Sequence, residues 1–582
     1  MKDKGKKFVI IENKNQALEY LKNIKRFEGV TPITFNFEPE KLLLENKITF
    51  KVGEAYGAPS LHKDTQKNSI RLTKEICKKI NINYRGIDLF QLFYYELIFF
   101  LNSSLMQLKI LKKIKEREKI GDMIIFNNIA PDNEEIYSKI TAKVFESNLR
   151  VIKYKYLNKK NYNFLEFIGY LQNIISKIKL SLVKEEENKI FFCGNKNIFE
   201  NVIKELNKDK INKIFRCNNS LQKSFFVNKE YIPFYRLLGL KTRHQERLIE
   251  DIKNFNKKPN NLQFLEDLDL EKELIPVLRE WIFYYIKVRF LEISGVINEM
   301  IKLMEKKNIN LIMLDADVNP FEKTFAQVGK MFNIPSIVVQ HGVIGGELGF
   351  FPKFADYFLV FGKKGQEILI KHGYPKKNII ITGSPQFDRY INQKIETNKQ
   401  KKIIFIMGGL ANSDVGISKE KWKKVYEMLF KALKKFPEYK LIIKLKKGDR
   451  DLAGLPEIIA KKENFQNLEV ITSISPIKLL SGADMVILTD STMVFDALLL
   501  DKPVISINFK ELEKFFCYKY LKPVKTVHNQ KELESAIKKS KTQTKKQLLE
   551  IRKALKTELF ELDGKASERV VDVINKLLLN KK

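Results

Sequence analysis

Hydroxyl-bearing side chains follow a short apolar run near the C-terminus, where a strand would pass into a helix. The run MVILTD ends at Asp490, and Ser491 and Thr492 begin the next helical segment. Because the start of a helix offers unpaired N–H donors and partial positive charge, we expect these residues to bind a diphosphate. Asp496, about one helical turn after Thr492, could accept hydrogen bonds from the two hydroxyls of a ribose. The alternative is that Thr489, Asp490 or Ser491 only caps the helix.

A histidine follows a second apolar run. His341 and Gly342 come directly after SIVVQ, so the imidazole is expected at the end of a strand rather than in the core. Gly342, Gly345 and Gly346 would let the backbone approach a ligand closely. His341 is therefore a candidate general base for an acceptor hydroxyl, or a contact to a donor phosphate. The alternative is a histidine with a purely structural role.

Two further loops end apolar runs. GSPQFD begins with Gly383 and Ser384, and MGG contains Gly408 and Gly409. We place Gly383 and Ser384 in the same cleft as His341. Gly408 and Gly409 are expected to give space to a leaving phosphate, unless they only turn the chain.

Other chemistries lack their motifs. The sequence has no GxxxxGK[ST] loop, HExxH or GxSxG, so P-loop nucleotidases, zincin proteases and α/β-hydrolases are not favoured. The four cysteines are widely spaced without a CxxC pair, which predicts neither a zinc site nor a disulfide framework. The Asp-x-Asp pairs Asp315/Asp317 and Asp267/Asp269 are interpreted as accidental, and no metal site is expected.

Strands alternate with helices along most of the chain, which predicts an α/β fold with mainly parallel sheets. We expect a first Rossmann-like domain over residues 1–392, with a mainly helical insertion over about 69–180. The polar run INQKIETNKQKK then separates it from a second Rossmann-like domain over 400–582. In such sheets ligands collect beyond the carboxyl ends of the strands, so the two domains would face each other across a cleft.

The net charge of +35 favours an anionic partner. Lys greatly outnumbers Arg, and neither an Arg-rich arm nor a zinc finger is present, so nucleic acid is not the expected partner. An anionic membrane surface remains a possible contact. The segment from 89 to 108 is either a buried helix or an interfacial helix followed by Lys109, Lys112, Lys113 and Lys115. We find no signal peptide or spanning segment, and we expect a cytoplasmic protein, with contact at the inner membrane face as an option.

The ordered motifs resemble those of a known superfamily. VVQHG, ADYFLVFGKKGQEILIKHGYPKKNIIITGSPQFD, TDSTMVFDALLLDKPVI and DGKASERVVDVI are similar to motifs of GT-B glycosyltransferases of surface-polysaccharide assembly. This superfamily includes capsule enzymes, CDP-glycerol glycerophosphotransferases and UDP-N-acetylglucosamine 2-epimerases. The resemblance covers residues 311–579.

The resemblance implies a glycosyltransferase that moves a sugar from a nucleotide-activated donor to a cell-surface glycan or lipid-linked acceptor. Ser491 and Thr492 would contact the donor phosphates, Asp496 would lie near the donor's sugar, and His341 would face the transferring group. No cofactor or metal is implied beyond the nucleotide-sugar substrate.

The chain departs from the superfamily at two motifs. Lys446 and Lys447 stand where the polyol-phosphate transferases carry His-Pro, so Lys446 is either a phosphate contact or a surface charge. TDSTMVFDA lacks the acid-rich glycine motif of the epimerases. These departures weaken the interpretations as a polyol-phosphate transferase and as a 2-epimerase. The alternatives to a glycosyltransferase are a CDP-glycerol-type polyol-phosphate transferase and a non-catalytic protein that binds a nucleotide or glycan.

Overall fold

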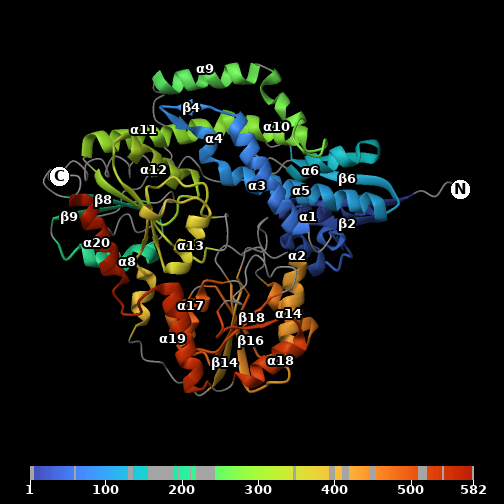
Figure 1. Ribbon diagram of the computed structural model, residues 1–582. Coiled ribbons are helices and arrows are strands. Elements are labelled where there is room, and N and C mark those ends of the chain that lie inside the picture. The colour runs from blue at the N-terminus through green and yellow to red at the C-terminus, as the bar shows by residue number, and fades with distance from the viewer. Residues whose placement is uncertain are drawn as a thin grey trace.

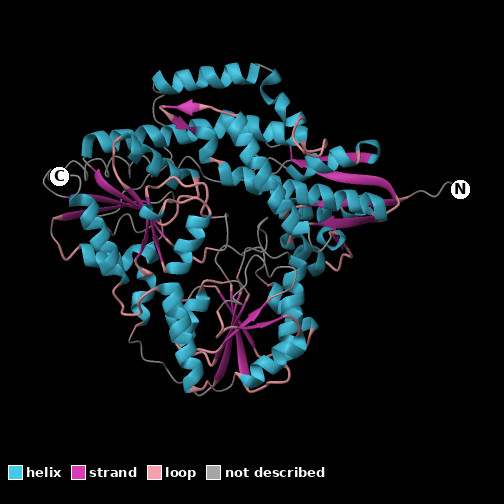
Figure 2. Cartoon of the chain, viewed as in Figure 1, coloured by secondary structure: helices cyan, strands magenta, loops and turns pink. Residues whose placement is uncertain are grey.

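Parallel strands joined through helices form three separate sheets, with helices on their faces (Figures 1 and 2). The computed structural model describes residues 5–57, 61–128, 136–154, 188–194, 196–209, 211–217, 243–257, 259–307, 309–344, 349–391, 400–408, 419–445, 454–472, 474–489, 491–508, 521–540 and 543–579. We call the three parts the N-terminal unit (5–154), the middle unit (188–391) and the C-terminal unit (400–559). Among the described residues, no helix combines the length and apolar character needed to cross a bilayer.

The N-terminal unit has a five-stranded parallel sheet in the order β3-β2-β1-β6-β7. Its strands are β1 (Lys6–Ile11), β2 (Val30–Thr34), β3 (Lys51–Val52), β6 (Ile120–Asn128) and β7 (Leu149–Tyr154). Its helices are α1 (Lys14–Lys22), α2 (Phe37–Glu45), α3 (Leu61–Lys79), α4 (Leu89–Leu92), α5 (Tyr94–Arg117) and α6 (Ile136–Val144). A short hairpin, β4 (Asn83–Tyr84) and β5 (Ile87–Asp88), precedes α4.

The expected helical insertion over about 69–180 has a different structure. Helices α3 and α5 lie in this range, but β6 and β7 lie there too and extend the sheet begun by β1. Residues 155–180 lie outside the described residues. Pairing between β1 and β6 joins segments far apart in sequence, which local helical spacing does not report. Over its described residues, the first expected domain thus contains two parallel sheets rather than one.

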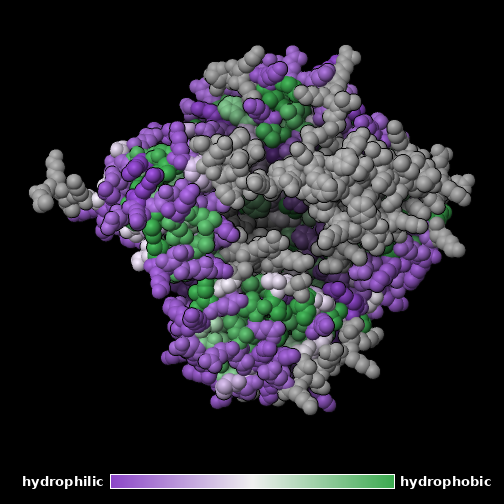
Figure 3. All heavy atoms as spheres, turned by 180° about the vertical axis from the view of Figure 1, so that it is seen from behind, coloured by the Kyte–Doolittle hydropathy of each residue, from purple (hydrophilic) through white to green (hydrophobic). Residues whose placement is uncertain are grey.

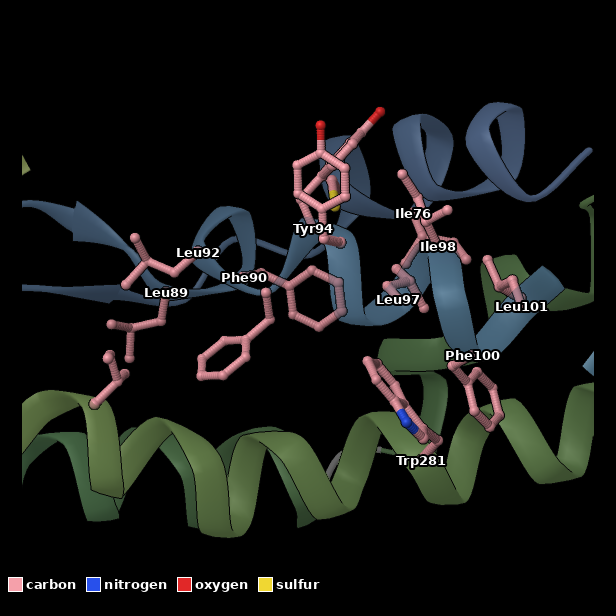
Figure 4. Close-up of a cluster of buried hydrophobic side chains, with 14 of the residues drawn as sticks. Ile76, Leu89, Phe90, Leu92, Tyr94, Leu97, Ile98, Phe100, Leu101 and Trp281 are labelled. Carbon is pink, nitrogen blue, oxygen red and sulfur yellow. The ribbon is translucent and has the colours of Figure 1, made fainter. Parts of the chain in front are cut away.

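Helix α5 is a buried helix, so its interpretation as an interfacial helix is wrong. Its apolar side chains pack against α10, as Figure 4 shows for Leu97, Phe100 and Trp281. The rings of Phe100 and Trp281 stack with their centroids 4.9 Å apart. The lysines that follow also bind the protein itself: Lys112 Nζ lies 2.7 Å from Glu271 and 2.9 Å from Glu273.

The middle unit has a six-stranded parallel sheet in the order β13-β12-β11-β10-β8-β9. Its strands are β8 (Asn188–Cys193), β9 (Asn212–Cys217), β10 (Ile309–Leu314), β11 (Ser336–Val339), β12 (Tyr357–Val360) and β13 (Ile379–Ile381). Its helices are α8 (Lys196–Leu206), α9 (Arg243–Lys257), α10 (Ile275–Tyr284), α11 (Phe290–Lys307), α12 (Pro320–Met331) and α13 (Lys363–Lys371). A π-helical turn, η6 (Tyr285–Arg289), joins α10 to α11.

The C-terminal unit has a six-stranded parallel sheet in the order β16-β15-β14-β17-β18-β19. Its strands are β14 (Lys401–Ile406), β15 (Tyr439–Lys444), β16 (Leu468–Ile471), β17 (Met485–Leu488), β18 (Val504–Ile507) and β19 (Lys525–Val527). Its helices are α14 (Lys419–Leu433), α15 (Leu455–Lys462), α16 (Pro476–Ser481), α17 (Met493–Leu499), α18 (Gln530–Lys539) and α19 (Lys545–Leu559). When these six strands are numbered in chain order, their order in the sheet is 3-2-1-4-5-6, which is the Rossmann arrangement. The switch point lies between β14 and β17. The expected α/β class with two Rossmann-like sheets is confirmed.

The last helix, α20 (Ala566–Leu579), returns to the middle unit and lies beside α8 (Figure 1). Val570, Ile574 and Leu578 pack against the middle sheet. Asp388, at the end of the GSPQFD motif, accepts hydrogen bonds from the backbone N–H groups of Ala566 and Ser567 at 3.0 and 2.8 Å. The GSPQFD motif and the last motif of the chain thus hold each other in place, and they connect the expected second domain back to the first.

The substitution Asp388→Ala should lower the free energy of unfolding by about 1–2 kcal/mol, because it removes the acceptor for two N–H groups at a helix start. Urea denaturation followed by circular dichroism measures this. Asp572→Ala, on the exposed face of the same helix, is the matched control and should change stability by less than about 0.5 kcal/mol. An equal effect of both substitutions would contradict the capping role.

Candidate functional site

A cavity of about 690 Å³ lies where the carboxyl ends of the middle and C-terminal sheets face each other. Seen from behind, the surface of the molecule is hollowed near its centre, above the C-terminal unit (Figure 3). The middle unit lines the cavity with Ile198, Asp315, Ala316, Asn319, Glu322, His341, Gln386 and Arg389. The C-terminal unit lines it with Ile406, Met407, Lys444, Ile474, Ser475, Pro476, Ser491, Thr492, Met493 and Asp496. The cavity therefore brings together residues that the sequence placed after two different strands. His341 follows one of them, and Ser491, Thr492 and Asp496 follow the other.

Two contacts orient the imidazole of His341. Its Nδ1 lies 3.0 Å from the backbone oxygen of Asp315, and a carbonyl can only accept, so Nδ1 carries the proton. The ring stacks on that of Phe350, with centroids 5.6 Å apart and planes 16° from parallel. In the neutral ring the lone pair then resides on Nε2. This tautomer suits a general base.

Glu322 brings a carboxyl group to the middle-unit wall. It lies in the first turn of α12, and its Oε2 is buried without a hydrogen-bond partner among the described residues. Burial, with the carboxylate of Asp315 nearby, raises the pKa of Glu322 to about 7. The hydrogen bond with the Asn319 side chain opposes this shift. A carboxyl group in this state could donate or accept a hydrogen bond near neutral pH.

The opposite wall begins at the switch point of the C-terminal sheet. Thr489, at the end of β17, accepts a hydrogen bond at 3.0 Å from the backbone N–H of Gly408, which follows β14. Ser491 Oγ accepts from the N–H of Met493 at 3.4 Å, so the hydroxyl also serves the start of α17. A β-carbon added at Gly342 would lie 3.3 Å from Thr492 Oγ1. The two predicted loops therefore lie close together at Gly342 and Thr492.

Asp496 is buried in the wall at 7% exposure, and Tyr390 donates a hydrogen bond to its Oδ1. Burial raises the pKa of Asp496 to about 6, while the bond from Tyr390 and the charge of Arg389 oppose the rise. One carboxylate oxygen is thus already engaged by the protein. The other remains the candidate contact for a ligand hydroxyl.

Lys444 and Arg389 bring positive charge to the cavity, and sequence reasoning missed both. Lys444 is the last residue of β15, two positions before the predicted Lys446. Arg389 follows GSPQFD directly and lies over the ring of Tyr390, 5.4 Å from its centroid. Their places at the end of a strand and directly after a motif are the only signal in the sequence, and that signal does not show which side chains there turn toward the cavity. Lys446, Gly409 and Asp490, like Gly345 and Gly346, lie outside the described residues.

Gly383 and Ser384 do not border the cavity. Gly383 has a φ of +79°, and a β-carbon there would lie 3.1 Å from Ala566 and 3.2 Å from Arg569 Nη2, so it packs against α20. Ser384 is buried. The part of this loop that reaches the cavity begins two residues later, at Gln386. The positive φ explains the glycine as a backbone requirement.

The two residues of the Asp315/Asp317 pair have different surroundings. Asp315 borders the cavity, whereas Asp317 is buried and accepts hydrogen bonds from the N–H groups of Phe354 and Ala355. Of the second pair, Asp269 binds Arg71 at 2.9 Å. Within the described ranges, no group of His, Cys, Asp and Glu is arranged to hold a metal ion. Metal independence stays a prediction.

Comparison with known families supports the expected resemblance. Residues 349–575 match the family model of UDP-N-acetylglucosamine 2-epimerase, which confirms the resemblance to this superfamily over that range. The match includes Ser491, Thr492 and Asp496 but begins after His341. No curated protein matches the chain significantly.

Solved structures similar to this chain include Staphylococcus aureus MnaA with UDP, at 14% identity and a TM-score of 0.44, covering 67% of this chain and 97% of that one. The Neisseria meningitidis UDP-GlcNAc 2-epimerase bound to UDP-GlcNAc is 15% identical, with a TM-score of 0.42, over 67% of this chain and 100% of that one. A variant of the wall teichoic acid polymerase TagF is 13% identical, with a TM-score of 0.40, over 72% and 99%.

Replacing Glu322 by Gln should stabilise the protein above neutral pH. Since its folded pKa is raised, the wild type is most stable while the carboxyl is protonated and loses stability as pH rises from its ordinary range through about 7. Gln mimics the protonated form, so we expect a gain of about 1–3 kcal/mol near pH 8 and little difference near pH 4. Urea denaturation at both pH values measures it. Glu250→Gln, exposed on α9, is the control. A gain that does not depend on pH would contradict this assignment.

Proposed function

We propose that the protein is a glycosyltransferase that moves a sugar from a nucleotide-activated donor to a glycan or lipid-linked acceptor. The observation that carries the proposal is the cavity between the two six-stranded sheets, which His341 borders from one side and Ser491 and Thr492 from the other. A ligand that spans both walls would place its phosphates near the hydroxyls and its transferring sugar near the imidazole. The match of residues 349–575 to a nucleotide-sugar enzyme family agrees with this.

The C-terminal wall is the side proposed to hold the donor. Ser491 and Thr492 would donate hydrogen bonds to the diphosphate, and Lys444, together with Arg389 from the middle unit, would offset its charge. Helix α17 has only seven residues, so these side chains rather than the helix dipole would supply the phosphate contacts. Asp496 would accept a hydrogen bond from the sugar or ribose through the oxygen that Tyr390 leaves available.

The middle-unit wall is the side proposed to activate the acceptor. The acceptor oxygen would attack C1 of the donor sugar as the bond from C1 to the phosphate oxygen breaks. The electron pair leaves with the nucleoside diphosphate, and the acceptor proton passes to Nε2 of His341. The hydrogen bond from Nδ1 to Asp315 would stabilise the imidazolium that forms. Closure of the two units would exclude water and favour transfer over hydrolysis.

Epimerisation is the second candidate, because the matching family model is that of UDP-N-acetylglucosamine 2-epimerase. An epimerase needs no acceptor, whereas a transferase does. Incubation with UDP-N-acetylglucosamine alone, followed by NMR, separates the two: formation of the C2 epimer without an acceptor would replace the transferase proposal. Transfer of a polyol phosphate would instead consume a CDP-polyol and release CMP.

A membrane-anchored acceptor would bring the enzyme to the inner face of the membrane, and the net charge of +35 suits an anionic surface. Cytoplasmic location, and the absence of a nucleic-acid partner, stay predictions.

The double substitution Ser491→Ala/Thr492→Ala should weaken nucleoside diphosphate binding about 10- to 100-fold, because it removes hydroxyl donors to a charged group. Calorimetry with CMP, CDP, UDP, GDP and ADP measures binding and identifies the preferred base. Thr557→Ala, exposed on α19, is the control in the same unit. Equal binding by the double variant would place the donor elsewhere.

Removing the imidazole in His341→Ala should lower turnover of the preferred donor by about 100- to 10,000-fold while its nucleotide binding survives. The fall is expected because the acceptor proton loses its base. Release of the nucleoside diphosphate is the measurement, and His244→Ala, exposed on α9, is the control. Unchanged turnover would remove His341 from the mechanism.

A further inference from the structure

A tyrosine of the N-terminal unit holds the chain that follows the His341 loop. Tyr95, in α5, is 3% exposed, and its hydroxyl accepts hydrogen bonds from the N–H groups of Gly349 at 2.8 Å and Phe351 at 3.2 Å. The same hydroxyl donates to the backbone oxygen of Phe351. Neither Gly349 nor Phe351 lies in a helix or strand. One side chain thus replaces the backbone pairing that this segment lacks.

Between these two anchor points lies Phe350, the residue that stacks on His341. Phe350 is 5% exposed, and its backbone oxygen accepts from the hydroxyl of Tyr374 at 3.3 Å. The plane of the imidazole is therefore set by Asp315 on one side and by the Phe350 ring on its face. Displacement of the segment would move that face and rotate Nε2 within the cavity.

A buried lysine, Lys323, packs over the ring of Tyr95. Lys323 is fully buried, with its Nζ 5.0 Å from the centroid of the Tyr95 ring and 5.1 Å from that of Phe354. The ammonium also donates to the backbone oxygen of Leu92 at 2.9 Å. Asp317 holds the far end of the segment through the N–H groups of Phe354 and Ala355 at 2.8 and 3.0 Å. These interactions fix the segment from 349 to 355 at both ends.

We propose that Tyr95 is a positioning residue for His341, acting through the backbone around Phe350, so that the N-terminal unit sets the geometry of a site that none of its described residues borders. The catalytic meaning of this role rests on the proposed function. The geometric part does not, because it concerns only the imidazole and its neighbours.

Tyr95→Phe tests the proposal, since it removes the hydroxyl and keeps the ring. The chain has five histidines, so labelling them at Cε1 gives a small set of NMR signals, and His341→Ala identifies the one of interest. We expect this signal to shift or broaden in Tyr95→Phe while that of His528 does not change. Tyr20→Phe is the matched control, because Tyr20 is equally buried in the same unit but belongs to another core cluster. A folded Tyr95→Phe with an unchanged His341 signal would overturn the proposal.

Hydrogen exchange of the wild-type protein gives a second measurement that does not depend on how the variant folds. The amides of Gly349 and Phe351 should exchange slowly although neither lies in a helix or strand. Rapid exchange of both would contradict their hydrogen bonds to Tyr95. Where the wild type turns over a donor, Tyr95→Phe should lower kcat about 10- to 100-fold with nucleotide binding unchanged. If the wild-type protein turns over no donor, the proposed function is contradicted, but the NMR result still decides the role of Tyr95.

Discussion

The rest of the structure depends on parallel strand pairing. Two neighbouring parallel strands must be joined by a crossover that returns the chain to the starting end of the sheet. Because all strands of such a sheet run in the same direction, all their carboxyl ends lie at the same edge. In the C-terminal sheet this edge gathers the segments after β14, β15 and β17, and Thr489 joins the first to the last through Gly408. In the middle sheet it gathers the segments after β10 and β11. The cavity exists because these two edges face each other.

Contacts between segments far apart in the sequence fix the positions of the two sheet edges relative to each other. Asp388 connects the end of the middle unit to α20, and α20 packs on the middle sheet although the C-terminal unit precedes it in the chain. Phe361, Phe387 and Tyr390 of the middle unit share a core cluster with Phe495 and Leu555 of the C-terminal unit. The two sheets are thus joined by apolar packing on one side of the cavity.

The sequence predicted the places of the two loops because both follow uninterrupted apolar runs, the signature of strands buried on both faces. Ser491, Thr492 and His341 then follow from strand direction alone. Lys444, Arg389 and Glu322 do not, since sheet twist and helix packing decide which side chain at a strand or helix end turns inward. Asp315 and Asp317 illustrate this limit: two residues apart, one borders the cavity and the other supports the segment from 354 to 355. Strand β6 escaped prediction because its partner β1 lies far along the chain, and β7 in turn pairs with β6.

The distribution of charge in the cavity follows from the same geometry and narrows its chemistry. Glu322, Asp315 and Arg389 lie on the middle-unit wall, whereas Lys444 and Asp496 lie on the C-terminal wall. In a partly enclosed space such charges are weakly screened, so an anionic group is attracted to Lys444 and Arg389 and repelled by the carboxylates. A molecule with a diphosphate near the two cations and hydroxyl groups near the carboxyl groups satisfies both kinds of side chain. A second phosphate next to Glu322 and Asp315 would lie against two carboxyl groups, so this part of the cavity favours hydroxyl groups over a phosphate.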